Sequence, residues 1–137
     1  MRLLIVGLGI DMVDLGEFRK RLSDELIAEL FLPAEIDYCR TQHRFWENFG
    51  ARFAAKEAVF KALGAGLEQG LRWHDVEVVR SSEGPVSVVL TGPARKAADR
   101  LQVTRSFISL SHCRDAALAA ALLERDDTPR SSEEDPL

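Results

Sequence analysis

Apolar side chains along the first forty residues follow two periods, one typical of strands and one of helices. Residues 3–10 contain no polar side chain, which predicts a buried strand. Leu15, Phe18 and Leu22 then recur at helical spacing and give the first helix an apolar stripe. The predicted helices of this half cover residues 15–22, residues 24–30 and a stretch beginning at Pro33.

The longest helical pattern covers residues 46–63, which are rich in Ala, Phe and Leu and end at Gly64, a residue suited to a helix C-cap. Two alternating stretches, 75–79 and 85–90, flank a Ser-Ser-Glu-Gly turn and predict a β-hairpin. Residues 116–123 are ambiguous, because their Ala and Leu favour a helix whereas their length and the preceding turn allow a strand. A helix over 93–101 and a strand over 106–111 complete the predicted elements.

Composition and charge describe one globular domain. The 137 residues are 46% hydrophobic and 29% charged. Residues 125–137 hold five acids and two bases, so 17 acids and 16 bases remain over residues 1–124. This near-neutral part argues against nucleic-acid binding, for which a basic domain is expected. We expect residues 1–124 to form the domain and residues 125–137, which are poor in apolar side chains, to be disordered.

Cysteine usage and hydropathy indicate the compartment. Cys39 and Cys113 are too few and too far apart for a disulfide framework, which indicates the reducing cytoplasm. No small-residue cleavage site precedes Asp11, so the N-terminal apolar run is a strand and not a signal peptide. No later stretch reaches the length of a transmembrane helix, so no membrane partner is expected.

Asp11 comes directly after the N-terminal apolar run, two residues beyond the pair Gly7-x-Gly9. The pair resembles a dinucleotide-binding loop, but the third glycine would fall at Met12 and no strand-helix-strand unit follows. What remains is a carboxylate delivered at the end of a buried strand. A structural aspartate in a loop or at a helix start is the alternative.

Charges in the segment 52–63 are not spaced like those of an ordinary solvated helix face. Arg52 and Lys56 are four residues apart, as are Glu57 and Lys61, so one side of the helix would hold three cations around one carboxylate. Such a side suits a polyphosphate bound by lysines, with a divalent metal on the carboxylate. An amphipathic helix with surface ion pairs is the alternative.

Ser111, His112 and Asp115 are the residue types of a hydrolase triad, but their spacing excludes one. Neighbouring side chains on a strand point to opposite faces, so Ser111 and His112 cannot form the hydrogen bond that activates a nucleophile. His112 lies at the end of its strand, where it is either a structural histidine or a contact to a phosphate or hydroxyl group.

Four segments of the chain carry a resemblance to a known family. They are Gly7-Leu8-Gly9-Ile10-Asp11-Met12-Val13-Asp14, Arg52-Phe53-Ala54-Ala55-Lys56-Glu57-Ala58 with Lys61-Ala62-Leu63-Gly64, Trp73-His74-Asp75-Val76-Glu77-Val78, and Ser109-Leu110-Ser111-His112. Together they resemble the holo-[acyl-carrier-protein] synthases, the small bacterial type of 4'-phosphopantetheinyl transferase. The resemblance runs in order over about residues 1–124.

The resemblance implies an α+β fold in which a helical layer packs on a small antiparallel sheet, with residues 116–123 as a strand. It implies a homotrimer with each active site at a subunit boundary. The implied enzyme is a transferase that moves 4'-phosphopantetheine from coenzyme A to a serine of an acyl carrier protein. The reaction depends on Mg²⁺ and releases adenosine 3',5'-bisphosphate.

The resemblance also assigns the site residues. Asp11 and Glu57 are expected to bind Mg²⁺, and Glu57, Lys56 and Lys61 are the expected catalytic residues. The residues expected to bind the coenzyme are Arg52, Lys56, Lys61, Gly64 and His112. The base that takes the serine proton is either Glu57 or a metal-bound water. Carboxylate and water ligands suit Mg²⁺ and Mn²⁺ alike.

The expected partner is a free acyl carrier protein or the carrier domain of a fatty-acid or polyketide synthase. This partner places the enzyme in fatty-acid biosynthesis and lipid metabolism. Two other functions use similar residues: an inactive module that binds coenzyme A or a carrier, and a metal-dependent pyrophosphate hydrolase.

The chain departs from the family pattern early in its first predicted helix. Family members commonly place there a basic residue that meets the acidic recognition helix of the carrier, whereas Gly16 and Glu17 stand here. We expect the three cations of residues 19–21 to supply the attraction instead. Alternatively, Glu17 completes a capping box with Asp14, and the cations are a solvated helix end.

Overall fold

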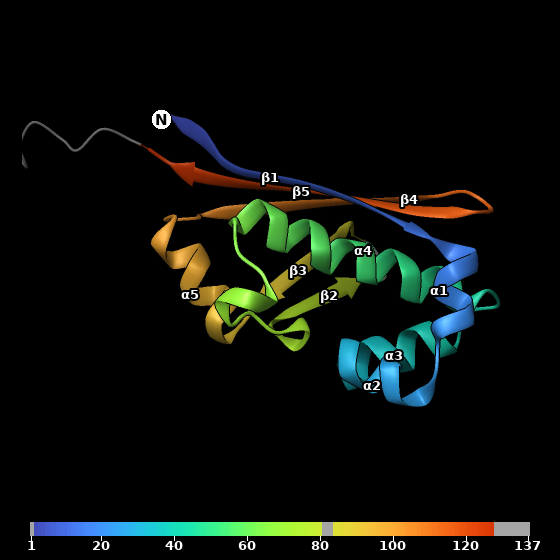
Figure 1. The fold of residues 1–137 in the computed structure, drawn as a ribbon. Coiled ribbons are helices and arrows are strands. Elements are labelled where there is room, and N and C mark those ends of the chain that lie inside the picture. Colours follow the sequence, from blue (N-terminus) through green and yellow to red (C-terminus); the bar gives the residue numbers. More distant parts are fainter. Residues whose placement is uncertain (1, 81–83, 128–137) are drawn as a thin grey trace, which may run out of the picture.

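The computed structural model describes residues 2–80 and 84–127 and has one helix, α4 (Phe45–Leu63), running through the centre of an α+β fold (Figure 1). On one side of α4 lie three long strands: β1 (Leu3–Asp14), β4 (Arg105–His112) and β5 (Ala116–Asp126). Shorter elements complete the fold: α1 (Leu15–Arg21), α2 (Asp24–Leu30), α3 (Pro33–Arg40), η1 (Leu67–Gln69), η2 (Trp73–Asp75), β2 (Val76–Arg80), β3 (Val86–Leu90) and α5 (Gly92–Arg100).

The three long strands form an antiparallel sheet in the order β1-β5-β4. Its register pairs Asp11 with Ala119 and His112 with Ala117. Strand β5 occupies the middle, where both of its edges are hydrogen-bonded to neighbouring strands. Its alanines at positions 117, 119 and 121 are fully buried. Pairing on both edges outweighs the helix propensity of these alanines, so residues 116–126 form the strand that the family resemblance implied.

Gly7 and Gly9 allow β1 to approach α4 closely. A Cβ atom on Gly9 would lie 1.9 Å from the carbonyl oxygen of Ala58, and one on Gly7 would lie 2.2 Å from that of Ala62. Neither position has room for a side chain, so the glycine pair serves helix–strand packing. This contact sets Asp11, two residues further along β1, beside the charged part of α4.

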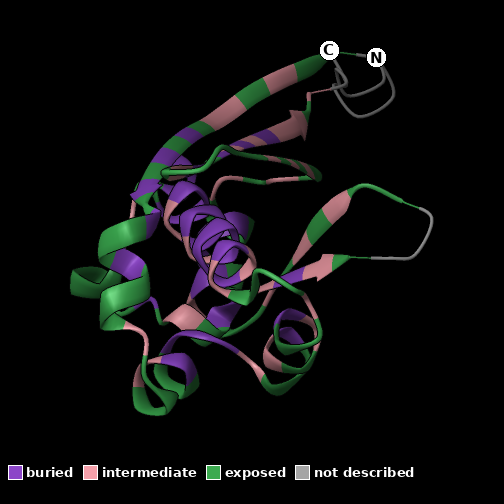
Figure 2. Cartoon of the chain, turned by 90° about the vertical axis from the view of Figure 1, so that its right-hand side faces the viewer, coloured by how far each residue is buried: buried purple, intermediate pink, exposed green. Residues whose placement is uncertain are grey.

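Helix α4 forms the core of the molecule. Thirteen of its 19 residues are buried, which is the pattern of a helix covered on several sides (Figure 2). It ends at Gly64, whose φ of 71° places it in the left-handed region, as the sequence predicted for a C-cap. The helix is therefore a rigid support for the charged residues in its second half.

Most predicted elements are present with ends shifted by a few residues. The N-terminal strand continues past residue 10 to Asp14, and one of its faces is exposed and not buried as predicted. The C-terminal strand is longer than predicted as well. Strand β5 continues to Asp126, so Arg125 and Asp126 belong to the sheet and not to a disordered tail. The N–H of Asp127 donates to the carbonyl oxygen of Arg2 at 2.8 Å. The disorder expected for the rest of the tail concerns residues 128–137, which lie outside the described residues.

The three-stranded sheet leaves several large apolar side chains exposed. They are Leu3, Ile5, Leu8, Ile10, Met12, Phe107 and Leu118. Extended exposed apolar surface is uncommon on monomeric proteins and often marks a contact with another protein. Within residues 2–80 and 84–127, no helix combines the length and hydropathy required to span a membrane.

Candidate active site

Lys61, Asp11 and Glu57 come together where α4 passes β1. The ammonium group of Lys61 donates to Asp11 Oδ1 at 3.0 Å and to the carbonyl oxygen of Ile10, also at 3.0 Å. The Asp11 side chain is 9% exposed, whereas that of Lys61 is 55% exposed. The structure thus unites three of the expected site residues in one charged cluster.

The carboxyl groups of Glu57 and Asp11 influence each other strongly. The pKa of Glu57 is raised from 4.5 to about 7 by burial, by the charge of Asp11 and by a hydrogen bond with Asp11, whereas Lys61 lowers it. Two carboxylates this close repel each other when both are ionised, and a divalent cation relieves that repulsion. The pair therefore has the donor chemistry of a Mg²⁺ or Mn²⁺ site.

Two carboxylates alone do not complete the coordination of such an ion. No cluster of three or more His, Cys, Asp and Glu side chains suited to a metal occurs among the described residues. Mg²⁺ is commonly held by one or two carboxylates, with water and substrate phosphates as the other ligands. The pair therefore fits a metal that is shared with a phosphate-bearing substrate.

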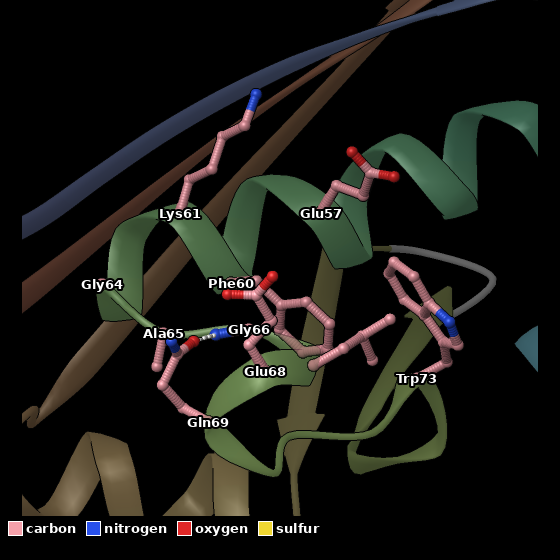
Figure 3. A pocket seen from close by; sticks show the side chains of 10 residues that line it. Glu57, Phe60, Lys61, Gly64, Ala65, Gly66, Glu68, Gln69 and Trp73 are labelled. Carbon is pink, nitrogen blue, oxygen red and sulfur yellow. Dashed lines mark hydrogen bonds between the residues drawn. The ribbon is translucent and has the colours of Figure 1, made fainter.

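A cavity of about 440 Å³ opens beside this cluster (Figure 3). Glu57, Phe60 and Lys61 of α4 line it, and Lys61 extends toward β1. Trp73 forms an aromatic wall, with its ring stacked on that of Phe60 at a centroid distance of 5.1 Å. The other lining residues are Gly64, Ala65, Gly66, Leu67, Glu68 and Gln69. We call this space the Trp73 cavity.

A second cavity, of about 260 Å³, also reaches the carboxyl pair. Asp11 and Glu57 line it together with Arg21 of α1. The remaining lining residues are Met12, Val13, Asp14, Glu17, Phe18 and Phe53. Because Glu57 lines both cavities, ligands bound in the two spaces would meet at the carboxyl pair. We call this space the Arg21 cavity.

Lys56 lines neither of these cavities, although the family resemblance implies that it is a catalytic residue and a coenzyme ligand. Its side chain is 0% exposed, and its ammonium group is 2.8 Å from Glu35 Oε1. Adjacent helical residues point about 100° apart, so Lys56 faces away from the cluster that Glu57 joins. Burial lowers the pKa of Lys56, and the charge of Glu35 opposes that shift.

Arg52 and His112 line a third cavity, of about 220 Å³, away from the carboxyl pair. Arg52 is 2% exposed, and its Nε has no hydrogen-bond partner among the described residues. His112 Nδ1 lies 3.7 Å from Glu47 Oε2. The other lining residues are Glu47, Asn48, Ala51, Arg80 and Leu110, and none of the set lines the Trp73 or Arg21 cavity.

Sequence reasoning assigned no role to Trp73 or to Arg80. Trp73 lies in one of the segments that carry the family resemblance, so its position there was the available signal. Arg80 stands at the end of β2 with no motif around it, and only the fold brings it to Arg52.

Comparison with known proteins finds relatives that match most of the chain. The sequence profile described as the 4'-phosphopantetheinyl transferase superfamily matches residues 7–121. A holo-[acyl-carrier-protein] synthase of Geobacter sulfurreducens is 43% identical over 125 residues, covering 89% of this chain and 99% of the relative. That of Desulforudis audaxviator is 45% identical over 122 residues, covering 87% of this chain and 92% of the relative.

Solved structures show the same fold. The holo-(acyl-carrier-protein) synthase of Bacillus anthracis, in complex with CoA (3',5'-ADP), aligns with a TM-score of 0.75 at 28% identity and covers 89% of this chain and 98% of its own. Holo-ACP-synthase from Plasmodium yoelii aligns with a TM-score of 0.79 at 26% identity, covering 93% and 100%.

Proposed function

This chain belongs to the 4'-phosphopantetheinyl transferase superfamily, and we propose that it transfers 4'-phosphopantetheine from coenzyme A to a serine of an acyl carrier protein or carrier domain, releasing adenosine 3',5'-bisphosphate. The observation that carries the proposal is the Asp11–Glu57–Lys61 cluster between two cavities. One cavity can take the coenzyme and the other the serine, so that the reacting groups meet at the cluster.

Asp11 and Glu57 would hold Mg²⁺, which would neutralise charge on the coenzyme's pyrophosphate. The repulsion between the two carboxyl groups supports this assignment. Lys61 lies on the same cluster, where its ammonium group would bind a phosphate oxygen and stabilise the leaving bisphosphate. Gly64 contributes to the wall of the Trp73 cavity, in which we place the coenzyme.

In the proposed reaction, the serine oxygen attacks the phosphorus that carries the pantetheine arm. The bond from that phosphorus to the bridging oxygen of the pyrophosphate breaks, and adenosine 3',5'-bisphosphate leaves with the bridging oxygen. The serine proton passes to Glu57 or to a water molecule beside it. Glu57 lines the Arg21 cavity, where we place the serine, so its carboxylate is suitably located for either route.

We assign Arg52 and His112 to the nucleotide end of the coenzyme, contributed across a subunit boundary. Their cavity is lined by two arginines against one acid, Glu47, but lies apart from Glu57 within one chain. This assignment requires a homotrimer, built through the exposed apolar strands, in which this cavity lies near the Trp73 cavity of a neighbour. The buried, unpaired Nε of Arg52 supports an anion as the ligand.

The proposed reaction is tested by following adenosine 3',5'-bisphosphate by chromatography, with and without an apo acyl carrier protein. A transferase releases this product only when Mg²⁺, coenzyme A and the carrier are all present. A pyrophosphate hydrolase would release it without the carrier, and an inactive binding module would release none.

The shared site has its own test, which is co-expression of Glu57→Gln and His112→Ala chains. Each variant alone should have low activity, because each assembly then lacks one half of every site. In mixed assemblies, some sites combine the unmodified Glu57 of a His112→Ala chain with the unmodified His112 of a Glu57→Gln chain. Activity should therefore return. No gain over the separate variants would contradict a site shared between subunits.

A further inference from the structure

The buried ammonium group of Lys56 is bound by three acceptors. It pairs with Glu35 Oε1 at 2.8 Å and donates to the carbonyl oxygen of Trp73 at 3.1 Å and to that of Val76. An ammonium group has three N–H donors, so this set satisfies all of them. Such complete pairing leaves no donor for a phosphate and explains how a charge is tolerated at 0% exposure.

The two carbonyl acceptors flank a single structural feature. Trp73 begins the short helix η2, and Val76 follows its last residue. Lys56, which belongs to α4, therefore hydrogen-bonds both ends of the turn. Glu35, the partner of Lys56, links further backbone to this network. Its carboxylate also accepts from the N–H of Leu32 at 2.9 Å and from that of Val78 at 3.0 Å.

The turn held in this way carries the aromatic wall of the Trp73 cavity. The Trp73 ring contacts Phe60 and Phe53, with centroid distances of 5.1 Å in both pairs. These ring contacts hold the side chain against α4, while the hydrogen bond from Lys56 fixes the backbone from which the ring projects. Lys56 is thus linked to the cavity through one residue, although it does not line the cavity.

We infer that Lys56 is a positioning residue, which sets the Trp73 wall of the coenzyme cavity through its hydrogen bonds to the η2 turn and its ion pair with Glu35. This role rests on the proposed function in one respect, namely that the coenzyme binds in the Trp73 cavity. Displacement of the wall then weakens coenzyme binding more than it slows the transfer step.

A phosphate-binding lysine and a purely structural lysine would act differently. Loss of a phosphate contact made in the transition state lowers kcat and leaves the Trp73 environment unchanged. Loss of a purely structural ion pair lowers the melting temperature without changing KM for coenzyme A in the folded enzyme. A positioning residue changes the Trp73 environment and KM for coenzyme A together.

The test is Lys56→Met in a Trp46→Phe background, in which Trp73 is the single tryptophan of the chain. Without coenzyme A, we expect its emission to shift to longer wavelength and its quenching by acrylamide to rise at temperatures where the variant is folded. KM for coenzyme A should rise about tenfold, while kcat changes less than about threefold. Unchanged emission and KM, or a fall in kcat alone, would overturn the inference.

A control and a double-mutant cycle separate positioning from loss of stability. Leu123→Ala removes a buried β5 side chain that does not line the cavity, so it should lower the melting temperature without altering Trp73 emission or KM for coenzyme A. In a Trp73→Ala background, Lys56→Met should add little further increase in KM, because its effect passes through the missing ring. Full additivity would contradict the proposed route.

If Lys56→Met does not fold, Glu35→Gln provides the same test, because it removes the charge that holds the ammonium group while keeping an acceptor for the backbone. It should shift Trp73 emission in the same direction, and no shift would overturn the inference. The emission readout requires no substrate. A negative result for the role of Lys56 is therefore distinguishable from a negative result for the proposed transferase activity, which is measured on the unmodified enzyme.

Discussion

Lys61 of helix α4 hydrogen-bonds Asp11 of strand β1 at 3.0 Å, although fifty residues separate them in the sequence. The contact exists because Gly9, two residues before Asp11, lets the strand lie directly against the helix. Glu57, one helical turn before Lys61, faces the same region and shares its charge environment with Asp11. A single packing contact thus assembles the cluster on which the proposed chemistry depends.

Replacement of Glu57 by Gln should reduce carrier modification at least about 100-fold, on the order of 3 kcal/mol of lost transition-state stabilisation. The variant keeps the size and helix propensity of Glu57 but removes the charge assigned to the metal. Its melting temperature should not fall below that of the unmodified protein. Initial rates at limiting Mg²⁺ provide the measurement.

Asp11→Asn is the companion variant and should lose activity in the same way. A higher Mg²⁺ concentration should partly restore the activity of either variant if the substitution weakens metal binding. Near-normal turnover of Glu57→Gln at limiting Mg²⁺ would show that the carboxylate is not the metal ligand.

Glu57 should also make stability depend on pH in the metal-free protein. Its folded pKa of about 7 lies above its ordinary value of 4.5, so the native state holds the proton more tightly than the unfolded chain between these values. The contribution of Glu57 to the free energy of unfolding should therefore fall as pH rises from about 4.5 to about 7. Denaturation in EDTA across this range, compared with Glu57→Gln, measures it. The free energy of unfolding of the unmodified protein, relative to that of Glu57→Gln, should fall with pH. If it stays constant or rises, burial and the charge of Asp11 do not raise the pKa of Glu57.

Truncation at two positions should separate the sheet from the C-terminal segment. Deleting residues 128–137, which contain a single large apolar residue, should leave activity and melting temperature nearly unchanged. Deleting residues 125–137 should lower the melting temperature by several degrees, because Arg125 and Asp126 pair with β1. Thermal unfolding of both proteins checks this. Equal effects of the two deletions would mean that the end of β5 contributes little.

Arg21 should contribute more to carrier binding than Arg19. Arg21 lines the cavity assigned to the carrier serine, whereas the Arg19 guanidinium lies 3.7 Å from the centroid of the Trp46 ring. Arg21→Glu should therefore raise KM for the carrier about tenfold and make its association less salt-sensitive, with KM for coenzyme A unchanged. Arg19→Glu is the matched control and should have the smaller effect. If neither variant, nor the two combined, changes KM for the carrier, the basic cluster is not the docking surface.

The sequence predicts those parts of the site that follow from local spacing. Glu57 and Lys61 are four residues apart on a helix and must share a face. The sequence also predicts a buried strand that ends before Asp11, whereas β1 continues to Asp14 and leaves Ile10 and Met12 exposed. Local spacing does not predict the burial of Arg52 and Lys56. Their spacing places them on one helix row, but the packing of α3 and β2 against that row buries both of them.

The fold shows the same division between local and tertiary information. Helix ends are marked by local signals such as Gly64, and the structure confirms that cap. Residues 116–126 have helical composition and become a strand because β1 and β4 pair with both of their edges. Propensity alone does not contain that information, and the family resemblance supplied it.

The most direct test of the proposed activity is the intact mass of an apo acyl carrier protein after incubation with this protein, coenzyme A and Mg²⁺. We expect a gain of one 4'-phosphopantetheine group, absent when the acceptor serine of the carrier is replaced by alanine and strongly reduced with Glu57→Gln. An unchanged carrier mass with the folded protein, whether or not coenzyme A is consumed, would contradict it.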